Sequence, residues 1–172
     1  MPGESPIVAK QIAMAGEQEI DALVAMSPEN TVYTGGFALP SQTLIRSRLV
    51  MCVVCQSGYT LEIVADMEES FTRALSVLGE VRAYNEFTTN PADALADALL
   101  EQGLAAGTVA IEVDYVPMCF FDRLKRRMPE ARFVDAGPIF ARLRTVKTPE
   151  EIERLTRVGR MAEEAPARDT SP

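Results

Sequence analysis

The sequence predicts an α/β fold: a single domain with a mixed, mostly central β-sheet of about six strands, helices on both faces, and a C-terminal connector helix. Two observations support this prediction. Short apolar segments alternate along the chain with segments that repeat apolar residues at helical spacing. The chain has 172 residues, of which 47% are hydrophobic and 24% charged, an ordinary composition for one globular domain.

The first elements are a helix, a strand and a second helix. The spacing of apolar residues predicts a weakly amphipathic helix over Ile7–Gly16, and the apolar run Ala22–Met26 predicts a short buried strand. Ser27 followed by Pro28 is typical of a helix start, because serine can cap the helix and proline lacks only an N–H that would stay unpaired there. This second helix should lead to a bend at Gly35-Gly36.

A β-hairpin follows. The segment Arg48–Cys55 is almost entirely apolar, as in a central strand that is buried on both faces. Ser57 and Gly58 predict a tight turn, and Tyr59–Ala65 alternates well enough to be the antiparallel partner. Because a hairpin within an α/β order brings in an antiparallel pair, the sheet is expected to be mixed.

After the hairpin the pattern returns to a helix and a strand. Asp66 and Glu69 have the spacing of a capping box, Gly79 is expected to end the helix, and Val81–Tyr84 predicts a short strand. The stripe expected to face the core from this helix consists of Met67, Phe71, Ala74, Leu75 and Leu78.

The rest of the domain continues the alternation. Strands are predicted at Thr108–Val113 and Arg132–Val134, and helices are expected to begin near Pro91, Pro117 and Pro138. The residues expected to face inward from the first two of these helices are Leu95, Ala96, Leu99 and Leu100, then Phe120, Phe121, Leu124 and Met128.

The clearest helix start in the chain lies at Thr148. Thr148 can cap the helix, Pro149 takes its first position, and Glu151 can reach back to the amide of Thr148. The apolar residues of one face are Ile152, Leu155, Val158 and Ala162. On the exposed side, the pairs Glu150–Arg154 and Glu153–Arg157 place an acidic residue four positions before a basic one. The pattern predicts a helix that docks on another surface.

Two separated motifs resemble the creatinase/prolidase/Xaa-Pro aminopeptidase family. The first is the run Leu-Arg-x-Val-Lys-Thr-Pro-x-Glu-Ile over residues 143–152, and the second is Ser-Pro-Glu-Asn-x-x-Tyr-x-x-Gly-Phe over residues 27–37. The resemblance implies a creatinase N-terminal domain-like fold over residues 1–145. It also implies a connector helix over residues 146–165, leading toward a metal-dependent "pita-bread" catalytic domain that is absent here. The polar composition of residues 166–172 separately predicts a disordered tail.

The absence of histidine limits the chemistry that the chain can support. The resemblance implies that the family's catalytic domain holds two divalent metal ions with two Asp, one His and two Glu, and cleaves Xaa-Pro bonds, creatine or other small amides. This chain contains no histidine, which also excludes Ser/His/Asp and Cys/His mechanisms. We expect no catalytic residue, metal ligand or cofactor in this chain, and we expect it to be inactive by itself.

Three other groups of residues have structural interpretations. Cys52 and Cys55 spell Cys-x-x-Cys, but residues three apart in a strand point to opposite faces, so two core cysteines are expected. Lys125-Arg126-Arg127 is predicted at a helix C-terminus, where cations interact favourably with the helix dipole. Gly35-Gly36 belongs to no phosphate-binding motif.

Charge and composition restrict the partners and the location. A net charge of −8 argues against nucleic acids and anionic membranes as partners. The longest apolar run is too short to span a bilayer, and the first residues lack a signal-peptide pattern. Three cysteines form no even disulfide framework, which suits a reducing compartment. We therefore expect a cytoplasmic protein.

The candidate site lies in the segment from Gly35 to Arg48, which is long for a loop in a compact domain. The resemblance implies that the corresponding loop of one subunit approaches the active-site mouth of its dimer mate. The candidate residues of this substrate entrance are Tyr33, Phe37, Ser41, Gln42 and Arg46. In the alternative interpretation, the two aromatic residues pack the loop and the arginine is solvated.

Three functions stay open. In the first, the chain is the non-catalytic N-terminal domain of a Xaa-Pro peptidase or creatinase-type metallohydrolase; its partners are the catalytic domain and a second subunit, and a homodimer is expected. In the second, it is a free-standing dimerisation or peptide-binding module with no hydrolase partner. In the third, it is a hydrolase with an unrelated mechanism, which would require turnover without metal.

Overall fold

The computed structural model describes residues 5–45 and 48–164. The strands are β1 (Ala22–Ala25), β2 (Met51–Cys55), β3 (Thr60–Ala65), β4 (Glu80–Tyr84), β5 (Thr108–Ile111) and β6 (Arg132–Asp135). The helices are α1 (Pro6–Glu17), α2 (Pro28–Gly35), α3 (Pro40–Leu44), the 3-10 turn η1 (Asp66–Glu68), α4 (Glu69–Leu75), α5 (Pro91–Glu101), α6 (Met118–Arg127), α7 (Gly137–Thr145) and α8 (Pro149–Glu164).

The strands form one six-stranded sheet in the order β4-β3-β2-β1-β5-β6. Strand β2 is antiparallel to β1 and β3, and the other neighbouring pairs are parallel. The tight turn between β2 and β3 is closed by the amide of Cys55, which donates to the carbonyl of Tyr59 at 2.8 Å, and Gly58 adopts a φ of 93° that favours glycine. The predicted mixed sheet is confirmed.

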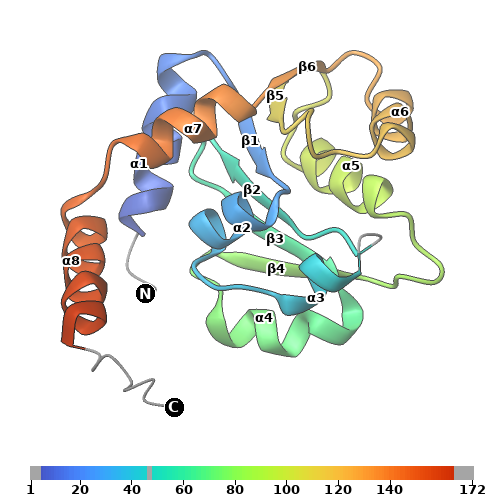
Figure 1. The fold of residues 1–172 in the computed structure, drawn as a ribbon. Coiled ribbons are helices and arrows are strands. Elements are labelled where there is room, and N and C mark those ends of the chain that lie inside the picture. Colours follow the sequence, from blue (N-terminus) through green and yellow to red (C-terminus); the bar gives the residue numbers. More distant parts are fainter. Residues whose placement is uncertain (1–4, 46–47, 165–172) are drawn as a thin grey trace.

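One face of the sheet is covered by α5 and α6, and we call these helices with that face the α5–α6 layer (Figure 1). Its core is continuous and apolar. The sheet contributes Ala22, Val24, Met51, Val53, Leu61, Ile63, Val109 and Ile111, and the helices contribute Leu95, Leu99, Phe120 and Leu124. Alternation along the strands sends every second residue into this core, as expected for a sheet that is covered on both faces.

The opposite face is covered by α1, α2 and α7, and we call it the α1–α2–α7 layer. It contains two separate apolar clusters. The first includes Leu23, Ala25, Cys52, Leu78, Phe140 and Leu143, and the second consists of Leu39, Val50, Val64 and Val81 with Phe37 at its edge. Cys52 lies in this layer and Cys55 in the α5–α6 layer, so the two cysteines point to opposite faces as predicted.

A buried carboxyl group lies on the α1–α2–α7 side of the sheet. Glu62 is opposite Cys52 in the β2–β3 register and is only 2% exposed. Its Oε2 accepts a hydrogen bond of 2.6 Å from the Ser76 hydroxyl. Burial raises the pKa of Glu62 to about 7. A Cβ on Gly35, the last residue of α2, would come within 3.1 Å of this carboxyl, so a larger residue there would require the Glu62 side chain to shift.

The apolar stripe predicted for the helix after the hairpin, which is α4, is wrong. Helix α4 ends at Leu75 rather than near Gly79, and Met67, Phe71 and Leu75 are 64%, 50% and 46% exposed. Ala74 is also exposed, and Leu78 is buried but lies beyond the helix. Thr72 is the buried residue of α4. A two-turn helix beside the edge strand has little sheet to cover, so its pattern could not place these side chains in the core.

Three further predictions about this half of the chain need correction. The Asp66 carboxylate accepts from the amide of its neighbour Met67 at 2.9 Å, and α4 has no side-chain cap, so the predicted capping box is absent. Strand β2 begins at Met51, three residues later than predicted. The segment treated as one long loop contains the short helix α3.

Strand β4 forms one edge of the sheet. The Arg73 guanidinium, held by Glu69 at 2.7 Å, donates a hydrogen bond of 2.9 Å to the carbonyl of Val81. On the same strand Arg82 forms an ion pair of 2.7 Å with Glu101 of α5. Charged side chains therefore cover this edge.

The basic cluster at the end of α6 interacts with α5. Arg127 forms ion pairs with Asp93 at 3.0 Å and Asp97 at 2.5 Å, and the Lys125 ammonium lies 5.8 Å from the centre of the Phe121 ring. These contacts agree with the structural interpretation of the cluster. In the described part of the chain, no helix is long and apolar enough to cross a membrane.

Helix α8 has the predicted capping box. The Thr148 hydroxyl accepts from the amide of Glu151 at 3.2 Å, and the Glu151 carboxylate accepts from the amide of Thr148 at 2.8 Å. No salt bridge of the described residues involves α8. The acidic and basic residues that are four positions apart on this helix therefore do not form ion pairs. The predicted disordered tail, residues 166–172, lies outside the described residues.

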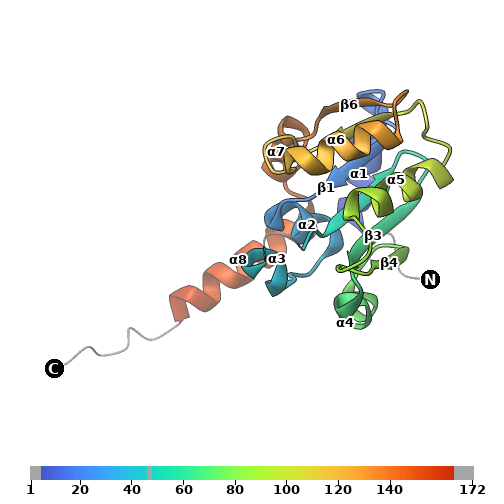
Figure 2. The same cartoon turned by 90° about the vertical axis from the view of Figure 1, so that its right-hand side faces the viewer.

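The apolar stripe of α8 is exposed. Ile152, Leu155 and Val158 are 56%, 58% and 63% exposed, and Ala162 is also exposed. Figure 2 shows α8 extending away from the rest of the domain. The helix therefore presents an uncovered apolar face.

Candidate functional site

The strand order creates a crevice between β1 and β5. The loop after β1 leads to α2 on one side of the sheet, whereas the loop after β5 leads to α6 on the other. These two strands are neighbours and parallel, so their carboxyl ends lie side by side at the same end of the sheet, which we call the carboxyl edge. Loops that leave neighbouring strands in opposite directions open a crevice at that edge, where ligands bind in open α/β sheets.

Glu112 fixes the β1 side of the crevice. This residue follows β5 and is 3% exposed. Its carboxylate accepts hydrogen bonds from the amides of Met26 and Ser27 at 2.6 and 2.9 Å, and from the Asn30 side chain at 2.6 Å. The Ser27 hydroxyl caps α2 by accepting from the amide of Asn30 at 3.3 Å. A buried carboxylate with three donors therefore holds the Ser-Pro-Glu-Asn motif against β5.

The β5 side of the crevice is a tight turn. The amides of Tyr115 and Val116 both donate to the carbonyl of Glu112, at 3.2 and 2.9 Å. Asp114 lies at the tip of this turn and is exposed. Within the described residues, the Asp114 carboxylate has no hydrogen bond or salt bridge to the protein. Two backbone hydrogen bonds hold the turn, and the Asp114 carboxylate at its tip is exposed to a ligand.

Helix α3 closes the third side through Gln42. The side-chain amide of Gln42 donates to the carbonyl of Met26 at 2.7 Å, and its oxygen accepts from the Thr31 hydroxyl at 2.9 Å. Gln42 is 5% exposed. Its polar atoms are therefore used to anchor α3 to β1 and α2.

These three elements enclose a pocket of about 360 Å³, which we call the switch-point pocket. The residues that line it are Pro28, Gln42, Thr43, Leu49, Asp114, Tyr115 and Pro117. Three exposed apolar side chains belong to the same segments: Leu44 at 81%, Val113 at 48% and Met118 at 79%. The volume is within the range of small-ligand sites. Pro28, Leu49 and Pro117 give the lining apolar surface, and the other four residues add polar groups.

The two aromatic candidates have packing roles. The Tyr33 hydroxyl donates to the carbonyl of Leu143 at 3.1 Å and accepts from Lys10 at 3.3 Å, and burial raises its pKa to about 12. Phe37 is partly buried and packs edge-on against Phe71, with ring centres 5.9 Å apart. Neither residue lines the switch-point pocket.

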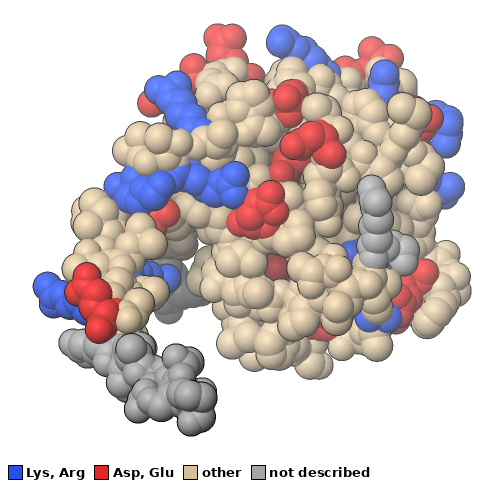
Figure 3. All heavy atoms as spheres, viewed as in Figure 1, with Lys and Arg blue, Asp and Glu red and all other residues tan. Residues whose placement is uncertain are grey.

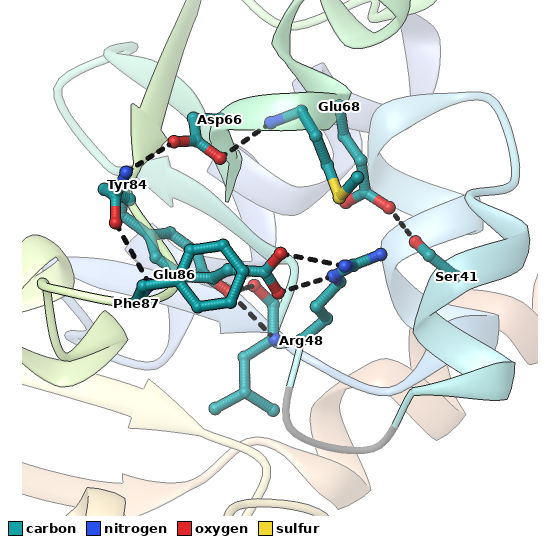
Figure 4. A network of polar contacts seen from close by, with 10 residues as sticks. Ser41, Arg48, Asp66, Glu68, Tyr84, Glu86 and Phe87 are labelled. Atoms are coloured by element: carbon teal, nitrogen blue, oxygen red, sulfur yellow. Dashed lines mark hydrogen bonds and ion pairs between the residues drawn. The ribbon is translucent and has the colours of Figure 1, made fainter.

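Ser41, on α3, belongs to a polar network that Figure 4 shows from close by. Its hydroxyl donates to Glu68, which is 8% exposed and whose pKa is raised by burial. In the same network Arg48 faces both oxygens of Glu86, with N–O distances of 2.7 and 2.8 Å, and this hydrogen bonding lowers the pKa of Glu86. The network ties the end of the predicted entrance loop to the loop after β4.

Of the four sequence candidates that the structure describes, one lines the pocket. Gln42 lines it, Ser41 lies one residue away, and Arg46 lies outside the described residues. Sequence reasoning missed Asp114 and Tyr115. The available signal was a polar turn directly after a buried strand, but its meaning depends on the strand order.

The described residues contain no group of three His, Cys, Asp or Glu side chains that could hold a metal ion. The three cysteines in this part of the chain are free thiols: Cys52 and Cys55 are buried, and Cys119 is exposed.

The comparisons with known proteins agree with the fold. A family model described as the creatinase/prolidase N-terminal domain matches residues 8–146, which include every strand of the sheet. The chain belongs to this family. A search of curated proteins found no match.

Solved structures with the same fold include a chain of domain size and longer chains. A proline dipeptidase from Streptococcus pneumoniae superposes with a TM-score of 0.69 at 21% identity, over 81% of this chain and 98% of the other. An X-Pro aminopeptidase from Thermotoga maritima gives 0.68 at 20% identity, over 85% of this chain. A dipeptidase from Pyrococcus horikoshii gives 0.70 at 20%, over 86% of this chain. This domain of the family corresponds to 38% of each of the last two chains.

Proposed function

We propose that the chain is the non-catalytic N-terminal domain of a Xaa-Pro peptidase or creatinase-type metallohydrolase, where it shapes the substrate entrance and takes part in dimerisation. The observation that carries this proposal is the family match, which ends at residue 146, just before the capped helix α8. Longer chains with this fold carry peptidase names, and the domain accounts for 38% of their length.

The exposed face of α8 supports a partner on its C-terminal side. Met161 is 61% exposed and lies on α8 with the four residues of the stripe described above. An isolated helix of this length is marginally stable in water, so burial against a partner would contribute most of its stability. In this proposal α8 connects to a catalytic domain, and that domain holds the two metal ions.

The carboxyl edge of the sheet supports the entrance role. The pocket, the anchored helix α3 and the exposed Leu44 and Met118 all lie at this edge. Apolar side chains exposed around a depression are typical of a surface that meets another protein. In the proposal this edge faces the active-site mouth of the dimer mate. Cytoplasmic location remains part of the proposal, because the free thiols suit a reducing compartment.

A chimera tests the proposal. The chain through α8 replaces the N-terminal domain of the Pyrococcus horikoshii dipeptidase, and the catalytic domain alone and the 172-residue chain alone are the controls. We expect metal-dependent Xaa-Pro cleavage by the chimera that exceeds that of the catalytic domain alone, and none by the chain alone. A folded, metal-loaded chimera that is no faster than its catalytic domain contradicts the entrance role, and turnover by the chain alone contradicts its non-catalytic assignment.

The alternative, a free-standing binding module, is favoured by one observation: the described residues of this chain form the switch-point pocket by themselves. Sedimentation analysis of the 172-residue chain tests dimerisation by the module. A monomer contradicts a free-standing dimerisation module, whereas a dimer is compatible with both alternatives.

A further inference from the structure

The switch-point pocket combines an apolar lining with one free carboxylate. Pro28, Leu49 and Pro117 supply apolar surface, and Leu49 is 6% exposed. The polar atoms of Gln42 are hydrogen-bonded to Met26 and Thr31. Gln42 therefore contributes shape to the pocket rather than hydrogen-bond donors to a ligand. Among the described residues that line the pocket, Asp114 is the one with a charged side chain, and a ligand would meet its carboxylate.

Both walls of the pocket are fixed before any ligand arrives. The turn that carries Asp114 is closed by two hydrogen bonds to the carbonyl of Glu112, whose own carboxylate binds the opposite wall. The backbone of Leu49 is held by the Tyr84 hydroxyl, which accepts from its amide at 3.1 Å and donates to its carbonyl at 3.0 Å. Because the walls are already ordered, binding of a ligand does not have to supply the free energy of ordering them.

The charge of the chain as a whole favours a cation, because its net charge is −8. Figure 3 shows that acidic and basic side chains are spread over the face viewed there, with several acidic ones in its middle. A carboxylate in a partly enclosed pocket interacts more strongly with a cation than one on an open surface, because less water screens it. An anion would be repelled by Asp114.

We propose that the switch-point pocket binds an alkylammonium group, in which a protonated primary amine pairs with Asp114 and its apolar stem packs against Pro28, Leu49 and Pro117. The volume of about 360 Å³ accommodates a single amino-acid-sized group. Two sources share this chemistry: the free amino end of a peptide with an apolar first residue, and the side chain of a lysine. This inference goes beyond the proposed function, because it requires neither a catalytic domain nor turnover.

A titration followed by amide NMR of the 15N-labelled chain tests the proposal at pH 6.5, where both kinds of amine are protonated. Leucinamide represents the free amino end, Nα-acetyl-lysinamide represents the lysine side chain, and N-acetyl-leucinamide keeps the apolar stem without charge. We expect saturable shifts at Thr43, Asp114 and Tyr115 with a Kd of about 1 mM for at least one of the two amines. The amine that binds more tightly identifies the source.

Two matched variants sharpen the test. Asp114→Asn keeps the size of the side chain and removes its charge, and we expect it to weaken amine binding about tenfold. Asp122→Asn makes the same change at an exposed position of α6 that does not line the pocket, and binding should be unchanged. The proposal is overturned if neither amine binds, if N-acetyl-leucinamide binds as tightly, or if Asp114→Asn binds like the parent chain.

Discussion

The α5–α6 layer and the α1–α2–α7 layer cover the same sheet with different chemistry. In the first, β1, β2, β3 and β5 contribute only apolar side chains to one continuous core. In the second, the Glu62 carboxyl lies on the same face of the sheet as two separate apolar clusters, and the Gly35 backbone packs against it. The first layer should be stable regardless of pH. The second should respond to protons, because a buried carboxyl is more easily accommodated in its neutral form.

The largest effect is expected in the α5–α6 layer. Leu99 of α5 is fully buried, and Leu99→Ala should lower the free energy of unfolding by about 3 kcal/mol, through lost burial and the cavity that remains. Urea unfolding at pH 5 and pH 8 measures the loss, which should be the same at both. A loss that changes with pH would contradict the assignment of this layer as pH-independent.

The next effect is expected at Glu62. Its pKa is about 7 in the folded chain, against an ordinary value of 4.5, so the folded state retains the proton to higher pH. The associated stability is fully present below pH 4.5 and is lost as pH rises from 4.5 through 7, up to about 3 kcal/mol in total. Glu62→Gln cannot ionise and should therefore flatten this part of the stability profile.

A matched control exists for Glu62 on helix α2. Glu29 is an exposed glutamate, and Glu29→Gln should leave the fall of stability between pH 4.5 and 7 in place. If Glu62→Gln keeps the same pH dependence as the parent chain, another group is responsible and the contrast between the layers is wrong.

A smaller effect is expected at Tyr33. Tyr33→Phe removes the hydrogen bond to the carbonyl of Leu143 and should cost about 1 kcal/mol. Amide exchange should quicken at the end of α7, and thermal unfolding should shift downward by a few degrees. Unchanged exchange in α7 would show that Lys10, which also donates to this carbonyl, is sufficient to hold it.

The smallest effect is expected on α8, which lies outside both layers. Leu155→Ala makes the same change as Leu99→Ala, but at a side chain that is 58% exposed, and it should alter domain stability by less than about 0.5 kcal/mol. Amide exchange of α8 in the 172-residue chain should be fast. Strong protection of these amides in a monomer would contradict the uncovered face.

Local patterns predicted the elements because local interactions form them. Thr148, Pro149 and Glu151 specify a helix start through contacts within one turn, and the structure has those contacts. The β2–β3 hairpin likewise depends on a turn at Gly58. The fold class followed from the order of such elements, and all six strands were predicted within about three residues at their ends.

Burial on α4 and the composition of the pocket could not be predicted in the same way. Met67 and Phe71 have the spacing of a core stripe, but whether a core faces them depends on the position of β4 at the sheet edge. Asp114 and Gln42 are 72 residues apart and meet only because β5 lies beside β1. Strand order is a property of the whole fold, and no local pattern in the sequence reveals it.

The Arg73 side chain has a consequence for solutions of this domain at high concentration. A sheet edge with free carbonyl groups is a template on which strands of other molecules can add, and such addition leads to fibrils. The Arg73 guanidinium already occupies the carbonyl of Val81 on β4, and Arg82 places a second positive charge on the same strand. An incoming strand would have to displace one arginine and approach another, so this edge of the sheet resists growth into an aggregate.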